Sequence, residues 1–119
     1  MTGDVSGTTT FDRAELLTRV DGMEDLLEEM LKLFLDEAQT MLAEVTDAVA
    51  AADADQIRKS AHSLKGAFLT ISAQNGSELA LQLEMMGRDG NVADAPIVLT
   101  ELIEECRRVD EAVKAEIGA

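Results

Sequence analysis

The longest regular hydrophobic pattern lies near the start of the chain. Between positions 23 and 52, apolar residues recur at steps of three and four positions: Met23, Leu27, Met30, Phe34, Ala38, Met41, Val45, Ala48 and Ala52. This spacing places them on one stripe of an α-helix. We therefore predict an amphipathic helix of about 30 residues, with most acidic residues of the segment on its solvated outer face.

Capping-box patterns mark three predicted helix starts. They are Asp12 with Glu15, Asp21 with Glu24, and Asp53 with Gln56. In such a box, the first side chain accepts a hydrogen bond from a backbone N–H that the helix leaves unsatisfied. The patterns predict a short helix over residues 12–20, the start of the long helix after Gly22, and a third helix from Asp53 to about Ile71.

Two further helices follow in the pattern. A boundary at residues 72–75 precedes a fourth helix that carries Leu79, Leu83 and Met86, and the polar segment around Gly90 ends it. Pro96 is tolerated in a first helical turn. The fifth helix then carries the stripe Leu99, Leu102, Cys106, Val109, Val113 and Ile117.

These elements indicate an all-α protein, an antiparallel up-down four-helix bundle with an additional short N-terminal helix. Residues 1–10 are short of apolar residues and predict a flexible leader, and residues 11–119 form one bundle domain. The 119 residues include three Phe, no Tyr or Trp, and one Pro. A sandwich or barrel of many short strands needs more turn residues than this chain has.

The charge balance excludes several classes of partner. Ten Lys and Arg against 24 Asp and Glu give a formal charge of -14, which repels phosphate backbones and anionic lipid surfaces, so we expect no nucleic-acid and no membrane partner. No apolar run approaches the roughly 20 residues that span a bilayer. The single Cys106 agrees with a reducing compartment, and we expect a cytoplasmic protein.

The third predicted helix has one apolar and one unusual polar face. Its core face is Ile57, Ala61, Leu64 and Phe68, and its outer face carries Arg58, His62, Lys65, Gly66 and Leu69. The chain's only histidine thus projects into solvent with basic residues nearby, and Lys59 and Arg88 extend a locally positive spot. A neutral exposed imidazole is a competent nucleophile. A glycine inside a helix costs about 1 kcal/mol relative to alanine, so Gly66 suggests the close approach of a partner.

The segment from Ser60 to Ala67 resembles the AHSLKG motif of histidine-containing phosphotransfer (HPt) domains of bacterial two-component phosphorelays. Comparable positions extend over about residues 11–117 and include Phe11-Asp12, Gly22, the break at Asp53, Leu83-Glu84 and Gly87-Arg88. The resemblance implies a signal-transduction protein in which His62 becomes a phosphohistidine.

The resemblance also implies roles for single residues. His62 would accept a phosphoryl group on Nε2 from a receiver-domain aspartyl phosphate and relay it to another receiver. Lys65 would stabilise the phosphoryl oxygens. Receiver docking would use Arg58, Ser63, Gly66 and Leu69. The protein would bind no cofactor or metal of its own, because the Mg²⁺ belongs to the receiver partner. The expected partners are response-regulator receiver domains and a hybrid sensor histidine kinase, and we expect a monomer.

Three positions depart from the family pattern. The family usually has Gly at Ser72, Asn or a small residue near Thr70, and an apolar residue at Gly76. All three lie at the join of the third and fourth helices.

Other functions stay open from the sequence. The chain could be a helical adaptor that docks receivers without transfer. It could also be a CheA-type phosphoacceptor domain phosphorylated by a kinase domain, although that class usually has a further His near Leu83. A carrier is most simply no independent enzyme, whereas a domain of a hybrid kinase would be classed as a transferase. A metal enzyme in the bundle core would need Glu-x-x-His motifs on facing helices, and the one His has none.

Overall fold

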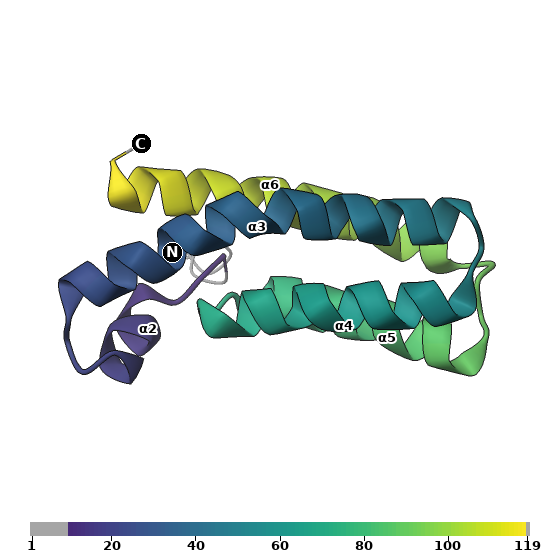
Figure 1. Cartoon of the computed structure of the whole chain (residues 1–119), viewed down its shortest axis with the longest axis horizontal. Helices are drawn as coiled ribbons and strands as arrows, with labels where there is room; N and C mark the ends of the chain where they lie inside the picture. Colours follow the sequence, from purple (N-terminus) through teal and green to yellow (C-terminus); the bar gives the residue numbers. More distant parts are fainter. Residues whose placement is uncertain (1–9, 119) are drawn as a thin grey trace, which may run out of the picture.

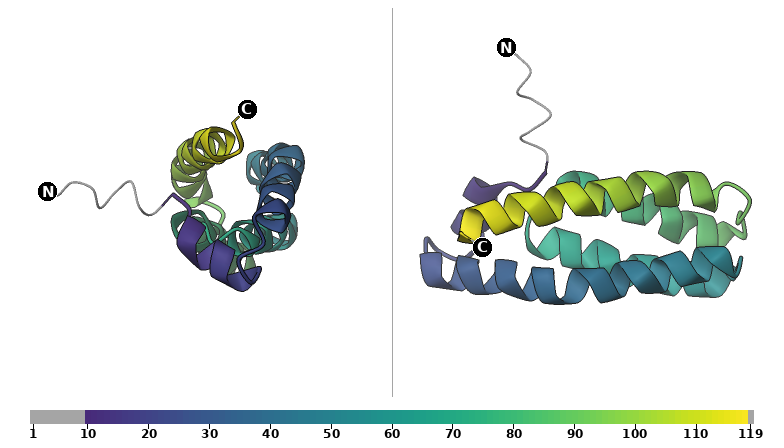
Figure 2. Two further views of the ribbon diagram at one scale, coloured as in Figure 1. Left: turned by 90° about the vertical axis from the view of Figure 1, so that its left-hand side faces the viewer. Right: turned by 90° about the horizontal axis from the view of Figure 1, so that it is seen from above.

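The computed structural model describes residues 10–118, and this part of the chain forms five α-helices without strands. The helices are α2 (Arg13–Arg19), α3 (Glu24–Ala50), α4 (Ala54–Thr70), α5 (Gln74–Asp89) and α6 (Ala95–Ile117). Successive long helices run in opposite directions (Figure 1). α3 and α5 each contact both α4 and α6, so the four long helices close around one core, as the end-on view in Figure 2 shows. The predicted antiparallel bundle is confirmed.

The short helix α2 lies beside the first turns of α3 (Figure 1). Of the predicted leader, residues 1–9 lie outside the described range, and Thr10 is buried. None of the helices in residues 10–118 combines the length and the apolar character needed to cross a membrane.

At two of the three predicted capping boxes, the first residue caps its helix. The Asp12 carboxylate accepts a hydrogen bond from the backbone N–H of Glu15 at 3.0 Å, and Asp53 accepts one from the N–H of Gln56 at 3.2 Å. Gly90 ends α5 with φ +77°, in the left-handed region that favours glycine. These three local signals therefore set helix ends where the sequence predicts them.

The predicted cap at Asp21 is wrong. Asp21 and Gly22 both adopt left-handed backbone conformations, with φ +56° and φ +75°. They form the turn that reverses the chain between α2 and α3, and the residue before α3 is Met23, whose side chain makes no capping bond. Tertiary packing of α2 against α3 thus outweighs a local capping pattern.

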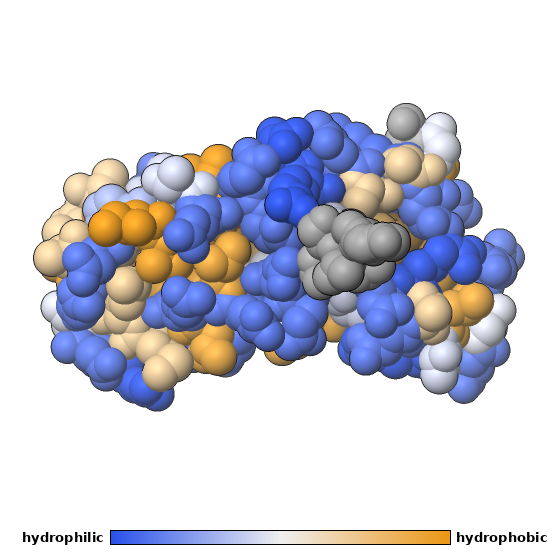
Figure 3. All heavy atoms as spheres, turned by 180° about the vertical axis from the view of Figure 1, so that it is seen from behind, coloured by the Kyte–Doolittle hydropathy of each residue, from blue (hydrophilic) through white to orange (hydrophobic). Residues whose placement is uncertain are grey.

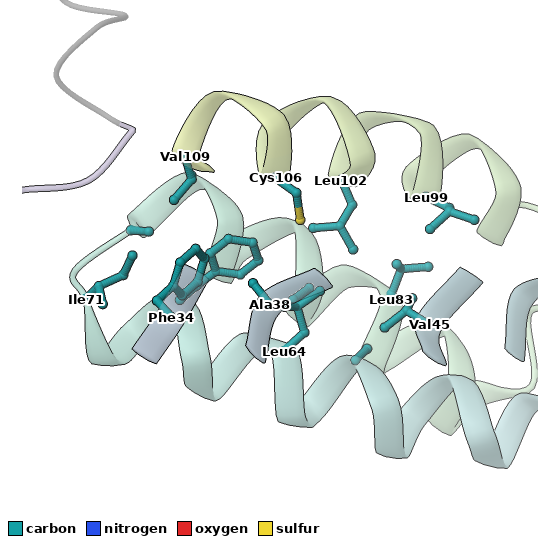
Figure 4. Close-up of a cluster of buried hydrophobic side chains, with 14 of the residues drawn as sticks. Phe34, Ala38, Val45, Leu64, Ile71, Leu83, Leu99, Leu102, Cys106 and Val109 are labelled. Atoms are coloured by element: carbon teal, nitrogen blue, oxygen red, sulfur yellow. The ribbon is translucent and has the colours of Figure 1, made fainter. Parts of the chain in front are cut away.

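The core face of α4 is as predicted. Ile57, Ala61, Leu64 and Phe68 are fully buried. The rings of Phe34 and Phe68 pack with centroids 5.6 Å apart and planes tilted by 46°, and Figure 4 shows apolar side chains from all four long helices meeting in this layer.

The core stripe of α3 is broader and shorter than predicted. Leu31 and Val49 are buried although they lie off the predicted stripe, whereas Met23 and Ala52 at its two ends are exposed. α3 packs against two helices, α4 and α6, so its buried face is wider than the stripe that one partner would cover. Met23 and Ala52 themselves lie just outside the helix, which spans Glu24–Ala50.

Ser72 holds the join between α4 and α5 in an unusual conformation. Its φ is +62°, a region where glycine carries no penalty, which accounts for the family's usual Gly at this position. Its hydroxyl accepts a hydrogen bond from Arg19 at 2.9 Å, and its carbonyl accepts one from the N–H of Asp12, also at 2.9 Å. Arg19 also donates to the carbonyl of Leu69 at 2.8 Å. These three hydrogen bonds hold α2 against the C-terminal end of α4.

The outer surface is largely polar. Figure 3 shows hydrophilic residues over most of the rear face, with apolar residues gathered toward the end that carries the connection between α5 and α6. Exposed apolar side chains of these two helices include Leu81, Met85, Ile97 and Ile103. Some exposed apolar surface is ordinary for a folded protein.

Gly76 and Gly66 form a matched pair for a stability test. A Cβ at position 76 would lie 2.5 Å from ring carbons of the buried Phe68, whereas a Cβ at position 66 would meet nothing within 4 Å. We expect Gly76→Ala to destabilise the fold by about 1–3 kcal/mol through overpacking. Gly66→Ala should stabilise it by roughly 0.5–1 kcal/mol through helix propensity. Urea unfolding measures both, and equal effects of the two substitutions would contradict the packing at Phe68.

Glu105 supplies a second test. The side chain is buried on α6, Arg108 approaches it only to 3.9 Å, and its Oε2 has no hydrogen-bond partner among the described residues. Burial raises the pKa of Glu105 above its usual value. The stability that this group contributes is complete below the unfolded-state pKa of about 4.3 and is lost as the pH rises through the higher folded-state pKa.

We therefore expect Glu105→Gln to unfold at a higher urea concentration than the wild type at pH 7, with the difference shrinking toward pH 4.5. The control is Glu104→Gln. That neighbouring carboxylate is exposed, and hydrogen bonds from Arg107 lower its pKa, so its replacement should bring no gain at pH 7. An unchanged or lower midpoint for Glu105→Gln at pH 7 would contradict the assignment.

Candidate functional site

His62 stands on the outer face of α4. Its neighbours along the helix that point inward, Ala61 and Leu64, are fully buried, and this fixes the rotation of the helix about its axis. The His62 side chain is 66% exposed as a result. The helical spacing thus correctly predicted that the only histidine of the chain faces solvent.

The imidazole is held by a carboxylate from the next helix. Nδ1 of His62 lies 3.0 Å from Oε2 of Glu84 on α5, and Nζ of Lys65 lies 2.8 Å from Oε1 of the same carboxylate. Both Lys65 and Glu84 are about one-fifth exposed. One partly buried carboxylate therefore joins the two residues that the sequence singled out.

Sequence reasoning gave Glu84 no role. It is one of 24 acidic residues, and it lies 22 positions after His62 on another helix. The available signal was its place beside Leu83 in a segment that resembles the family, but only the packing of α5 against α4 shows what it touches.

The contact with Glu84 determines which ring nitrogen can react. A carboxylate only accepts hydrogen bonds, so a neutral His62 ring carries its proton on Nδ1 and donates it to Glu84. Nε2 then bears the free lone pair. Among the described residues, none forms a hydrogen bond with Nε2. The accessible nucleophilic atom of the site is therefore Nε2.

Glu84 is ionised at neutral pH. Partial burial raises the pKa of its carboxyl group, but hydrogen bonds from Lys65 and from His62 outweigh this effect, and the pKa lies below its usual value. The site therefore contains a carboxylate, an ammonium group and an imidazole in one continuous set of contacts.

The locally positive spot predicted around His62 is largely neutralised. Arg58 lies 2.9 Å and Lys59 3.1 Å from the carboxylate of Asp55, and Arg88 lies 3.6 Å from Asp89. Lys65 is paired with Glu84. The two pairs with Asp55 have the i,i+3 and i,i+4 spacings at which opposite charges meet on a helix. In all, the four cations face three carboxylates and leave only a weak excess of positive charge.

The predicted docking residues share the outer face of α4 with His62. Ser63 and Gly66 are exposed, Leu69 is 47% exposed, and the side chain of Arg58 is 41% exposed. The Ser63 hydroxyl donates to the carbonyl of Lys59 at 3.3 Å. Since a side chain at position 66 would meet no other atom within 4 Å, no contact inside the protein requires glycine there.

A shallow apolar hollow lies beside this face, between α3 and α4. It has a volume of about 120 Å³ and is lined by Met30, Leu33, Phe34, Glu37, Ala67, Thr70 and Ile71. Leu33 at its rim is 54% exposed. The sequence did not predict this hollow, because it depends on how α3 and α4 meet.

The described residues offer no metal centre. No group of three or more His, Cys, Asp or Glu side chains within residues 10–118 is arranged to hold a metal ion. Cys106 is buried, and burial raises the pKa of its thiol to about 12, so it is not a reactive thiolate at neutral pH.

The helical bundle and the exposed histidine on α4 fit the phosphotransfer domains that the sequence resembles. Comparison with known proteins supports the same family. The Hpt domain family model matches residues 29–112, which include His62, Lys65, Gly66 and Glu84. The chain belongs to the Hpt domain family. No curated protein sequence gives a significant match.

Two solved structures are similar over 92% of this chain and 95% of their own length. Histidine-containing phosphotransfer protein B (HptB) from Pseudomonas aeruginosa PAO1 has 27% sequence identity and a TM-score of 0.84. The HPT domain of the Hpt sensor hybrid histidine kinase from Shewanella has 24% identity and a TM-score of 0.82, and supports the fold alone.

The contact between His62 and Glu84 predicts a tautomer. We expect ¹⁵N chemical shifts at high pH to show the neutral ring of His62 protonated on Nδ1. Glu84→Ala removes the acceptor and should shift the ring toward protonation on Nε2. Glu78→Ala is the control, because Glu78 is also on α5 but bonds Gln74. A ring already protonated on Nε2 in the wild type would contradict the geometry.

Proposed function

We propose that the chain carries phosphoryl groups within a phosphorelay by accepting them on Nε2 of His62. Histidine phosphotransfer is the function of the family to which the chain belongs. The observation that supports His62 as the acceptor is its geometry: Nδ1 is held at 3.0 Å by Glu84, and the opposite nitrogen faces solvent on a side chain that is 66% exposed.

The transfer step is a displacement at phosphorus. The lone pair of Nε2 attacks the phosphorus of an aspartyl phosphate on the donor receiver, an N–P bond forms, and the O–P bond to the aspartate breaks. The leaving group is the aspartate carboxylate. The proton on Nδ1 stays on the ring, which becomes positively charged, and the carboxylate of Glu84 stabilises that charge. The reverse displacement by a second receiver's aspartate regenerates neutral His62.

The protein contributes position rather than chemical groups for bond breaking. Two buried residues, Ala61 and Leu64, fix the helix that presents His62, and Glu84 fixes the ring. Correct placement of two reacting groups removes much of the entropic barrier to their reaction. Such a carrier needs no nucleotide, and it depends on its partner for the metal ion and for the acidic acceptor residue.

Receiver domains are the partners of Hpt domains in general. We propose that a receiver docks over His62 and Gly66, where no side chain blocks close approach, and extends toward Leu69, Ser63, Arg58 and the hollow between α3 and α4. The interface should be small, because a carrier has to leave each partner quickly. We also propose that the carrier is a monomer and that it is cytoplasmic. Its Cys106 is unpaired, and the cytoplasm keeps such a thiol reduced.

The proposal is tested with a receiver domain labelled on its aspartate. We expect the wild type to acquire acid-labile phosphate, and His62→Gln to acquire none. Gly66→Ala should fold normally but accept phosphate more slowly, by about tenfold if the added methyl group costs the complex roughly 1.4 kcal/mol.

The controls address folding and docking separately. Ser60→Ala on the buried side of the same helix removes only a hydroxyl bonded to the carbonyl of Gln56 and should leave transfer unchanged. Label that persists on His62→Gln would overturn the assignment of His62. Binding of the receiver without transfer by the wild type would instead favour the adaptor function.

A further inference from the structure

A shallow groove lies between α3 and α6, on the side of the bundle away from His62. This α3–α6 groove has a volume of about 320 Å³ and is lined by Gln39, Leu42, Ala43, Thr46, Asp47 and Ile103. α3 and α6 form one side of the bundle, and α4 and α5, which carry His62 and Glu84, form the opposite side (Figure 1, Figure 2). A molecule bound in the groove would therefore leave the acceptor histidine accessible.

Apolar groups line much of the α3–α6 groove. Leu42 is half-buried, Ala43 is exposed, and Ile103 is 44% exposed. The hydroxyl of Thr46 already donates to the carbonyl of Leu42 at 2.8 Å, so it needs no hydrogen bond from a partner. Covering these side chains with an apolar group removes apolar surface from water and stabilises a complex. The groove therefore suits an apolar side chain of a partner.

The α3 side of the groove is strongly acidic. Positions 33–57 of the chain include six Asp and Glu and no Lys or Arg. On α3, four of these carboxylates are exposed and form no ion pair with any residue in the described range: Asp36, Glu37, Glu44 and Asp47. The basic residues of α6, by contrast, pair with carboxylates of their own helix. The carboxylates of α3 therefore remain available to a partner.

We propose that the α3–α6 groove docks a basic amphipathic helix of a partner protein, with an apolar side chain against Ile103 and basic side chains beside Asp36 and Asp47. At a rise of 1.5 Å per residue, these two carboxylates are about 16 Å apart along α3, and Leu42 lies between them. The partner helix then carries Lys or Arg one to two turns before and after its apolar residue. This inference goes beyond the proposed phosphoryl transfer and does not depend on it.

Charge argues against other occupants of the groove. α3 carries eight Asp and Glu and one Lys, so a symmetric dimer formed through this helix would bring like charges together. A nucleic acid or an anionic lipid surface would meet the same repulsion. A basic protein segment has the charge that complements this surface.

The first experiment measures binding of the full chain to a synthetic peptide that serves as the probe. The peptide is a helix of about 18 residues of Ala, Leu and Lys, with Leu at its centre and Lys one to two turns away on both sides. We expect saturable binding that weakens as the salt concentration rises, and no binding of the same peptide with Glu in place of Lys. Amide ¹⁵N shifts should change along the groove and not around His62. Absence of binding, or shifts centred on His62, would overturn the proposal.

Two isoleucines of α6 provide a matched pair of variants. Ile103→Ser removes the apolar contact and should weaken peptide binding by about fivefold. The control is Ile97→Ser, because Ile97 is 63% exposed on the same helix but does not line the groove. That substitution should leave the affinity unchanged. Equal losses for the two variants would overturn the proposal.

Two double variants separate the groove from general attraction to an acidic protein. Asp36→Asn with Asp47→Asn should weaken binding by about tenfold at low salt, roughly threefold for each lost pair. Asp25→Asn with Glu29→Gln removes two charges from the same helix outside the groove and should weaken binding much less. Equal losses would overturn the proposal and leave non-specific attraction. Self-association of the wild type that Ile103→Ser abolishes would also overturn it, in favour of a second copy of the chain.

The second experiment is phosphoryl acceptance from a labelled receiver with the groove saturated by the peptide. The rate should stay within about twofold of the rate without peptide, because the groove and His62 lie on opposite sides of a bundle that we expect to stay rigid. A larger loss would overturn the separation of the two surfaces. If the peptide binds as expected but the wild type accepts no phosphate, the proposed function fails while the docking surface holds.

Discussion

The close contact between α4 and α5 is the constraint on which the site depends. At Gly87, a Cβ would lie 2.6 Å from the carbonyl oxygen of Ala54 and 2.6 Å from the backbone nitrogen of Arg58. The two helix backbones therefore approach more closely than any side chain at position 87 would permit. One turn earlier on α5, this approach brings the Glu84 carboxylate within 3.0 Å of His62. A larger residue at position 87 would move the carboxylate away without touching the histidine.

The same contact is maintained at the other end of α5. Gly76 makes room for the ring of Phe68, and that ring packs on Phe34 of α3. Two glycines on one face of α5 thus set its distance from α4 on both sides of the site. Glycine weakens a helix by roughly 0.5–1 kcal/mol relative to alanine. In α5 the close packing of the helices offsets this cost. On α4, no contact within the protein requires glycine at position 66.

Sequence periodicity predicted what depends on one helix at a time. The buried stripe of α4 and the exposure of His62 follow from a rotation of about 100° per residue, and both are confirmed. Contacts between two helices could not be predicted from this periodicity. Glu84 reaches His62 only because of the register between α4 and α5, and Asp21 fails as a cap because the turn into α3 requires a left-handed backbone there. Ser72 belongs to the same group, since its left-handed conformation is held by Arg19 from α2.

Charge around the site limits how a partner can be recognised. The whole chain carries a formal charge of -14, and the basic residues near His62 are paired with carboxylates of their own neighbourhood. Attraction over distances beyond the Debye length of about 8 Å at physiological salt is therefore weak for a receiver whose acceptor pocket is acidic. In the proposed complex, recognition would then depend on short-range contact at Gly66, Leu69 and the neighbouring apolar hollow. Contact of this kind gives slower association but leaves dissociation fast, and fast release is what a protein that must pass its phosphoryl group from one partner to another requires.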